Sequence, residues 1–167
     1  MSSMRNIRML ARYTAWANTR LYETLSSMPD AAEVFARRSG SGSMASILGH
    51  AYVVDLIWKG HLEALPHGFA SRTMQQAMNL PTLRDAQATS DRWYVDYSDG
   101  LSESGHDEPV RFQFVDGGAG CMTRGDMLLH VVNHKTYHRG YVADLLYQRG
   151  ARPPVMDLPV YLRDMDA

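Results

Sequence analysis

Four long segments of this chain repeat apolar residues at the three- and four-residue spacing of an amphipathic helix. A helix with one apolar stripe has to bury that stripe against another element, so four of them in one chain favour a four-helix bundle, with either up-and-down or crossover connections. The third stripe is the weakest of the four. The four predicted helices run approximately over residues 6–28, 43–66, 82–101 and 123–150.

The ends of these segments carry residues that start or stop helices. Pro29 follows the first segment and cannot continue it. Ser43 and Thr82 are suitable N-cap residues for the second and third. Thr123 opens the last segment, with Asp126 three residues later, which is a variant of the capping box and places a carboxylate at the positive helix end. The sequence therefore sets helix boundaries as well as helix number.

A different pattern fills the stretch from Pro109 to Gly120. Val110, Phe112 and Phe114 alternate with other residues, and a glycine-containing turn sequence follows them. Alternation with a period of two, next to such a turn, indicates a short hairpin or an extended excursion. The predicted fold class is thus all-α, a four-helix bundle with this excursion before its last long helix.

Composition narrows the classes of protein to consider. The chain has 167 residues, 45% of them hydrophobic, which suits a single domain over residues 1–167 with a real core. Seventeen basic and eighteen acidic residues give a net charge of -1 without a dense basic run, so we expect no nucleic-acid partner. No apolar run is long enough for a membrane span, and the single cysteine, Cys121, suits a reducing compartment. We expect a cytoplasmic protein without a membrane anchor.

Candidate chemistry is concentrated in the last predicted helix. His134 and His138 are four residues apart, a spacing that lets two imidazoles on one helix face converge on one metal ion. The pair lies on an apolar stripe, where an imidazole without a partner costs a few kcal/mol. His130 extends the same row, so it could also be a ligand, although a core position bonded to a carbonyl is the favoured interpretation.

The other histidines, and the residues between His134 and His138, give less evidence for a metal site. No glutamate stands between His134 and His138, so the sequence is not the H-E-x-x-H arrangement of zinc peptidases. The remaining candidates, His61, His67 and His106, lie toward predicted helix ends or loops and are expected to be solvated surface residues.

The sequence resembles the DinB-like proteins, also called the DinB/YfiT superfamily, over nearly the whole chain. The resemblance rests on Tyr-Thr-Ala-Trp-Ala-Asn at residues 13–18, Ser-Ile-Leu-Gly-His at residues 46–50 with Asp55 and Trp58, and most specifically on residues 130–140. Two positions depart mildly from the family's pattern. Gly49 stands where asparagine is frequent, and Lys135 stands where glycine is frequent, but neither change removes a histidine.

The resemblance implies a four-helix bundle that holds a divalent metal, zinc or nickel, on His50, His134 and His138. Three imidazoles leave a coordination position open for water or substrate. Similar proteins include S-transferases that act on low-molecular-weight thiols, so a metal-dependent thiol transferase is the first functional hypothesis. A metal-dependent hydrolase and a non-catalytic, stress-related metal-binding protein remain alternatives. Related proteins commonly pair, which implies a homodimer, and the family name implies DNA damage-inducible expression.

Some roles around the predicted ion stay open. Ligating imidazoles usually donate their second ring N–H to an acceptor, and Asp55, Asn133 and Tyr137 lie within about a turn of a ligand. A surface position for Asn133, and the core or a contact within the bundle for Tyr137, are the favoured alternatives. Asp55 lies too far round its helix to be favoured. No residue can be assigned as the general acid or base. The aromatic residues are expected to pack in the core rather than to form a substrate cage: Tyr13, Trp16, Trp58 and Trp93.

Overall fold

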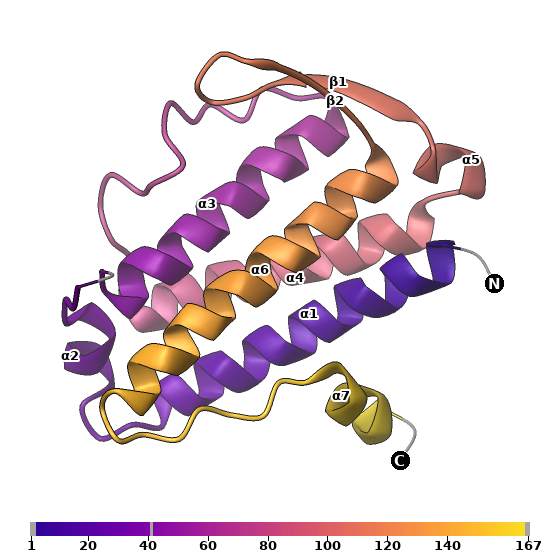
Figure 1. Cartoon of the computed structure of the whole chain (residues 1–167). Coiled ribbons are helices and arrows are strands. Elements are labelled where there is room, and N and C mark those ends of the chain that lie inside the picture. The colour runs from indigo at the N-terminus through magenta and orange to yellow at the C-terminus, as the bar shows by residue number, and fades with distance from the viewer. Residues whose placement is uncertain (1–2, 41, 166–167) are drawn as a thin grey trace.

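Four long helices form a bundle in the computed structural model, which describes residues 3–40 and 42–165 (Figure 1). This confirms the all-α bundle predicted from the sequence. Within the described residues, no helix combines the length and the apolar character needed to cross a bilayer. The long helices are α1 (Ser3–Ser26), α3 (Met44–Glu63), α4 (Leu80–Gly100) and α6 (Arg124–Tyr147).

Local side-chain bonds start three of these helices. The Ser43 hydroxyl accepts a hydrogen bond from the backbone N–H of Ser46, and the Ser46 hydroxyl accepts one from the N–H of Ser43, which completes a capping box. Thr123 caps α6 as predicted. The N-cap of α4 is Asn79 instead of Thr82, whose backbone N–H donates to the Asn79 side chain at 2.9 Å. That helix therefore starts earlier than the sequence predicted, with proline in its first turn.

The connection between α3 and α4 makes this a crossover bundle. The Tyr94 hydroxyl donates to the backbone of Asp55 and the Tyr97 hydroxyl donates to that of Leu62, so the two helices run in the same direction. Residues 64–79 must then return along the length of α3 before α4 begins, as Figure 1 shows. Ala64, with a φ of 56°, ends α3 in the left-handed conformation and turns the chain into this crossover loop.

Most of the core falls into two apolar halves, and a third, smaller cluster of Tyr13, Ala17 and Tyr161 joins α7 (Leu158–Met165) to α1. One half gathers around Leu21, Phe35, Met44 and Leu145, and the other around Trp58 and its neighbours on α4 and α6. Both halves bury their side chains almost completely, which supplies the main favourable term in folding. Near the middle of each long helix, buried polar side chains lie between the two apolar halves.

These polar residues form a single hydrogen-bonded layer, here called the polar layer. Lys135 Nζ lies 2.7 Å from Asp55 Oδ2 and donates to Gln87 Oε1 at 2.6 Å. The Gln87 amide also donates to Asp91, whose pKa is raised to about 6, mainly by burial. Each long helix contributes to the layer, which consists of Asn18, Asp55, Gln87, Asp91, Lys135 and Arg139.

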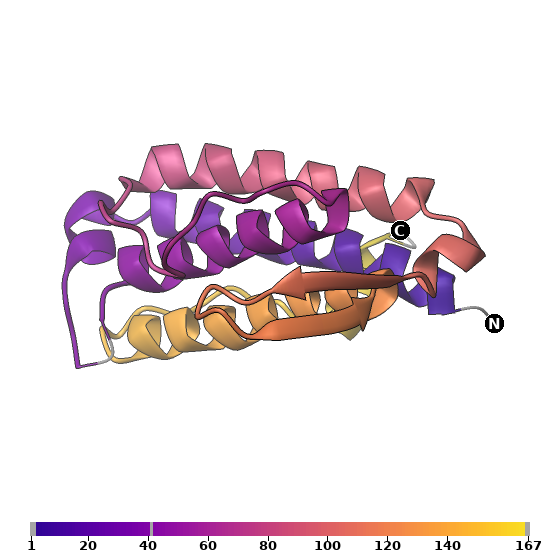
Figure 2. The ribbon, with the colours of Figure 1, turned by 90° about the horizontal axis from the view of Figure 1, so that it is seen from above.

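Shorter elements flank the four long helices. The predicted hairpin is present, with β1 (Pro109–Gln113) antiparallel to β2 (Ala119–Thr123) and Gly117 at a φ of 95° in the turn. Figure 2 shows it beside the bundle, and Phe112 packs against Trp58 of α3. Three short helices were not predicted from the sequence: α2 (Ala31–Ala36), α5 (Glu103–His106) and α7 (Leu158–Met165).

Candidate metal centre

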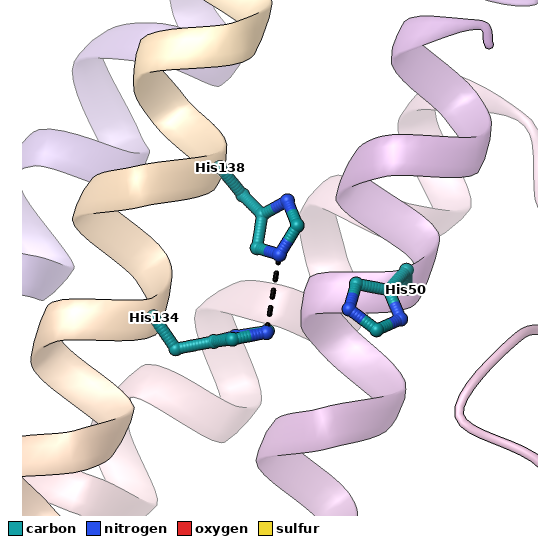
Figure 3. A group of neighbouring side chains, drawn as sticks. All are labelled: His50, His134 and His138. Atoms are coloured by element: carbon teal, nitrogen blue, oxygen red, sulfur yellow. Dashed lines mark hydrogen bonds between the residues drawn. The ribbon is translucent and has the colours of Figure 1, made fainter. Parts of the chain in front are cut away.

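Three histidines from two neighbouring helices meet at one side of the bundle. His50 lies on α3, and His134 and His138 lie one turn apart on the antiparallel helix α6. One ring nitrogen from each lies within 4.8 Å of the others, and Figure 3 shows the three imidazoles facing one another. This group, called the histidine triad below, could hold a metal ion.

The nitrogen positions fit a small divalent ion. Metal–nitrogen bonds of about 2.0–2.1 Å in a tetrahedral site place two ligand nitrogens about 3.4 Å apart. The Nε2 atoms of His134 and His138 are 3.1 Å apart, close to that spacing. The His50 ring centroid lies 4.8 Å from that of His138 and 5.2 Å from that of His134, so the three rings lie around one position.

Burial keeps the α6 histidines in the neutral form that binds metal. It lowers the pKa of His134 to about 3, with a further contribution from His138. Burial also lowers the pKa of His138, to about 4, with a further contribution from His50. Because a metal ligand must be a neutral imidazole, both side chains are ready to coordinate at neutral pH without losing a proton first.

His50 has an acceptor for its second ring nitrogen. Its Nδ1 lies 2.8 Å from the backbone oxygen of Arg72, in the crossover loop. A Cβ built at Gly49 would lie 2.8 Å from the sulfur of Met74, so the glycine leaves room for the loop at this point. The Gly49 departure from the family pattern therefore coincides with the place where the loop contacts α3.

None of the orienting residues considered from the sequence has that role. Asp55 faces away from the triad into the polar layer, where it bonds Lys135. Asn133 is exposed, as favoured. Tyr137 is also exposed, with its hydroxyl bonded to that of Tyr141 at 2.9 Å on the same helix, so of the two positions favoured for it the one in the core is wrong.

The other histidines lie outside the triad. His130 is half-buried against Trp58, with ring centroids 4.7 Å apart, and within residues 3–40 and 42–165 it makes no bond to a carbonyl. His67 is half-buried, and His61, whose pKa is lowered by burial, packs against Phe112. The side chain of His106 is only 14% exposed, because it packs over a glycine at the start of α6. The surface positions predicted for these last three are therefore wrong.

An open pocket of about 180 Å³ adjoins the triad and includes His50 and His134 in its lining. Its walls are mostly apolar, and they include Trp58, which serves both the core and the pocket. The hairpin tip closes one side with Phe114 and Val115. Such a pocket is smaller than most sites for drug-sized ligands and suits a small molecule or the reacting end of a larger one.

Sequence reasoning missed two features of this region. Arg72 lies in a loop without periodicity, 22 residues from the histidine that its carbonyl contacts, so no local pattern connects them. The polar layer did have a signal, because Asp55 and Lys135 are charged residues on otherwise apolar helix faces.

Comparison with known proteins places these features in a family. The sequence model of the DinB family matches residues 1–165. Protein DinB of Bacillus subtilis (strain 168) is 27% identical over 161 residues, covering 92% of this chain and 91% of that protein. The crystal structure of a DinB-like protein from Bacillus cereus ATCC 10987 has the same fold, with a TM-score of 0.61 at 14% identity, covering 84% of this chain and 90% of that one.

Proposed function

Because this chain belongs to the DinB family, we propose that its histidine triad binds one divalent transition-metal ion and that the protein is a metal-dependent thiol S-transferase. The observation that carries this proposal is the meeting of three imidazoles beside an open pocket. A sealed site would suit a structural ion, whereas an open side gives a substrate access to the remaining coordination position.

The ligand set favours zinc or nickel. Imidazole nitrogen suits zinc, nickel and copper better than magnesium, which prefers oxygen. Neutral ligands also leave the full charge of the ion in place, and such an ion lowers the pKa of a bound thiol below its free value of about 8.5. The substrate would then be a low-molecular-weight thiol together with an electrophilic acceptor.

The surrounding residues support this role in distinct ways. The Arg72 carbonyl holds the His50 ring by its Nδ1, which fixes one ligand before substrate arrives. Trp58 and Phe114 line the pocket with apolar surface, which limits the access of water to a reactive thiolate.

Metal content tests the site itself. We expect about one zinc or nickel ion per chain in the wild-type protein, and a large loss in His50→Ala, His134→Ala and His138→Ala. His61→Ala and His67→Ala are matched controls, because both residues lie near the pocket but outside the triad. Elemental analysis measures all six proteins after the same gentle purification and reloading. The same metal content in all six would show that the assignment is wrong.

Activity tests the reaction class. Metal-loaded protein should accelerate the transfer of glutathione, mycothiol or bacillithiol to an electrophile, and the apo protein should not. Faster reaction of the loaded form with a panel of esters or amides, but not with thiols, would replace the transferase with the hydrolase. No reaction in either panel would favour a non-catalytic, stress-related metal-binding protein.

A further inference from the structure

One residue of the pocket lining beside the triad has a permanently charged side chain. Apart from its histidines, its lining residues in the described part of the chain are apolar, with the exception of Arg72. A guanidinium keeps its positive charge at every physiological pH.

We propose that Arg72 binds a carboxylate of the substrate and thereby selects acidic thiols over neutral ones. This inference rests on the proposed function, since it names the substrate class of the same site. A guanidinium presents paired N–H donors that match the two oxygens of a carboxylate. The chain itself supplies no carboxylate to the pocket lining within the described ranges.

The guanidinium of Arg72 is available for such a contact. Arg72 is exposed, and within residues 3–40 and 42–165 its guanidinium has no hydrogen-bond acceptor and no acidic partner. Other arginines are engaged by the protein: Arg12 pairs with Asp99, and Arg124 pairs with Glu108. Arg72 thus differs from these two residues, because it lines the pocket beside the triad and its guanidinium is unpaired.

The backbone of Arg72 is fixed relative to the triad. Its carbonyl accepts from His50 when the Nδ1 of that ring carries the proton, at 2.8 Å. Two residues later, Met74 lies against Gly49 of α3. On the other side, the backbone N–H of Thr73 donates to the Ser71 hydroxyl at 3.1 Å, which shapes the turn. The segment 71–74 therefore orients His50 through the Arg72 carbonyl and also carries the Arg72 side chain. This side chain thus begins at the edge of the pocket that His50 lines.

Apolar walls strengthen the expected contact. Trp58, Phe114 and Val115 line the pocket together with Arg72. A charge pair that is partly screened from water by such walls interacts more strongly than a fully exposed pair. We expect the carboxylate to improve binding of a thiol by about fivefold, the upper range for a partly exposed pair.

The experiment compares two thiols of the same length. 3-Mercaptopropionate carries a carboxylate, and 3-mercapto-1-propanol carries a hydroxyl in its place. Each is titrated into cobalt-loaded protein, where thiolate binding to the ion is followed by the absorption band it produces. The proteins are wild type, Arg72→Gln, Arg72→Lys and Arg38→Gln, the last being an exposed arginine outside the pocket.

The wild type and Arg38→Gln should prefer the acidic thiol, Arg72→Lys should keep part of the preference, and Arg72→Gln should lose it. Cobalt content should be equal in all four, because the Arg72 carbonyl is retained in every variant. A preference of the same size in Arg72→Gln would overturn the inference and leave the metal centre intact. If none of the proteins takes up cobalt, the proposed metal centre fails, and this inference fails with it.

Discussion

Replacing Lys135 by methionine should destabilise the fold more than most single substitutions. The Lys135 and Asp55 side chains are only 5% and 1% exposed, and their charges are 2.7 Å apart. Methionine retains the apolar stem but leaves the carboxylate of Asp55 without its cation. Breaking a buried pair by removing one partner costs about 3–5 kcal/mol. For a domain of this size that corresponds to a fall in Tm of about 10 °C.

The loss should depend on pH in a direction that follows from Asp55. Burial raises the pKa of Asp55 above its usual value, and the charge of Lys135 opposes that rise. Removing the lysine therefore raises the pKa further. The folded variant then binds a proton more tightly than the unfolded chain, so its stability falls as pH rises above the ordinary aspartate pKa of about 3.9. The deficit should be larger at pH 8 than at pH 5.

Urea unfolding at both pH values, with chelator present to remove metal, measures this deficit. The double variant Lys135→Met/Asp55→Leu serves as the control, because replacing a whole buried pair by apolar residues is often neutral. It should recover most of the lost stability. A deficit of less than about 1 kcal/mol that does not change with pH would refute the argument that an uncompensated carboxylate causes it.

Two further predictions concern the loop and the oligomeric state. Gly49→Leu should displace Met74 and the crossover loop and thereby separate His50 from the Arg72 carbonyl. We expect zinc binding, measured by competitive chelator titration, to weaken by about tenfold. Gly49→Ala requires only the flexible Met74 side chain to move, so it should change zinc affinity little, and equal affinities of the two variants would contradict this reasoning. The chain should form a homodimer through the exposed apolar side chains of α6, including Leu129 and Tyr137; light scattering that gives 18.8 kDa at all micromolar concentrations would rule this out.

The long helices could be predicted because their signals are local. Apolar periodicity identifies the long helices, and Ser43 and Thr123 are the caps of α3 and α6 as predicted. The starts of two helices were misplaced: α1 begins at Ser3 instead of residue 6, and α4 begins earlier because Asn79 is its cap instead of Thr82. The short helix α7 has only eight residues, too few for a helix to be stable by itself. Tertiary contacts hold it, with Tyr161 packed edge-on against Tyr13.

The site was predictable in part for a similar reason. The spacing of His134 and His138 is a property of one helix, whereas His50 joined them through the family resemblance. The position of Arg72 depends on the path of a crossover loop, which no periodicity encodes. The two departures from the family pattern have physical partners in this chain, because Gly49 contacts Met74 and Lys135 bonds Asp55.

The polar layer has a consequence for how the protein would acquire its ion. It ties α3 to α6 through Asp55 and Lys135 without any metal, and the flanking apolar halves hold the same two helices. The triad is therefore preorganised, and loading is a binding event on a folded protein instead of a step in folding. Preorganised imidazole sites follow the general affinity order in which nickel, copper and zinc exceed manganese and iron. We therefore expect that metal supply decides which ion such a site carries in the cell, and that the protein can be emptied and reloaded without unfolding.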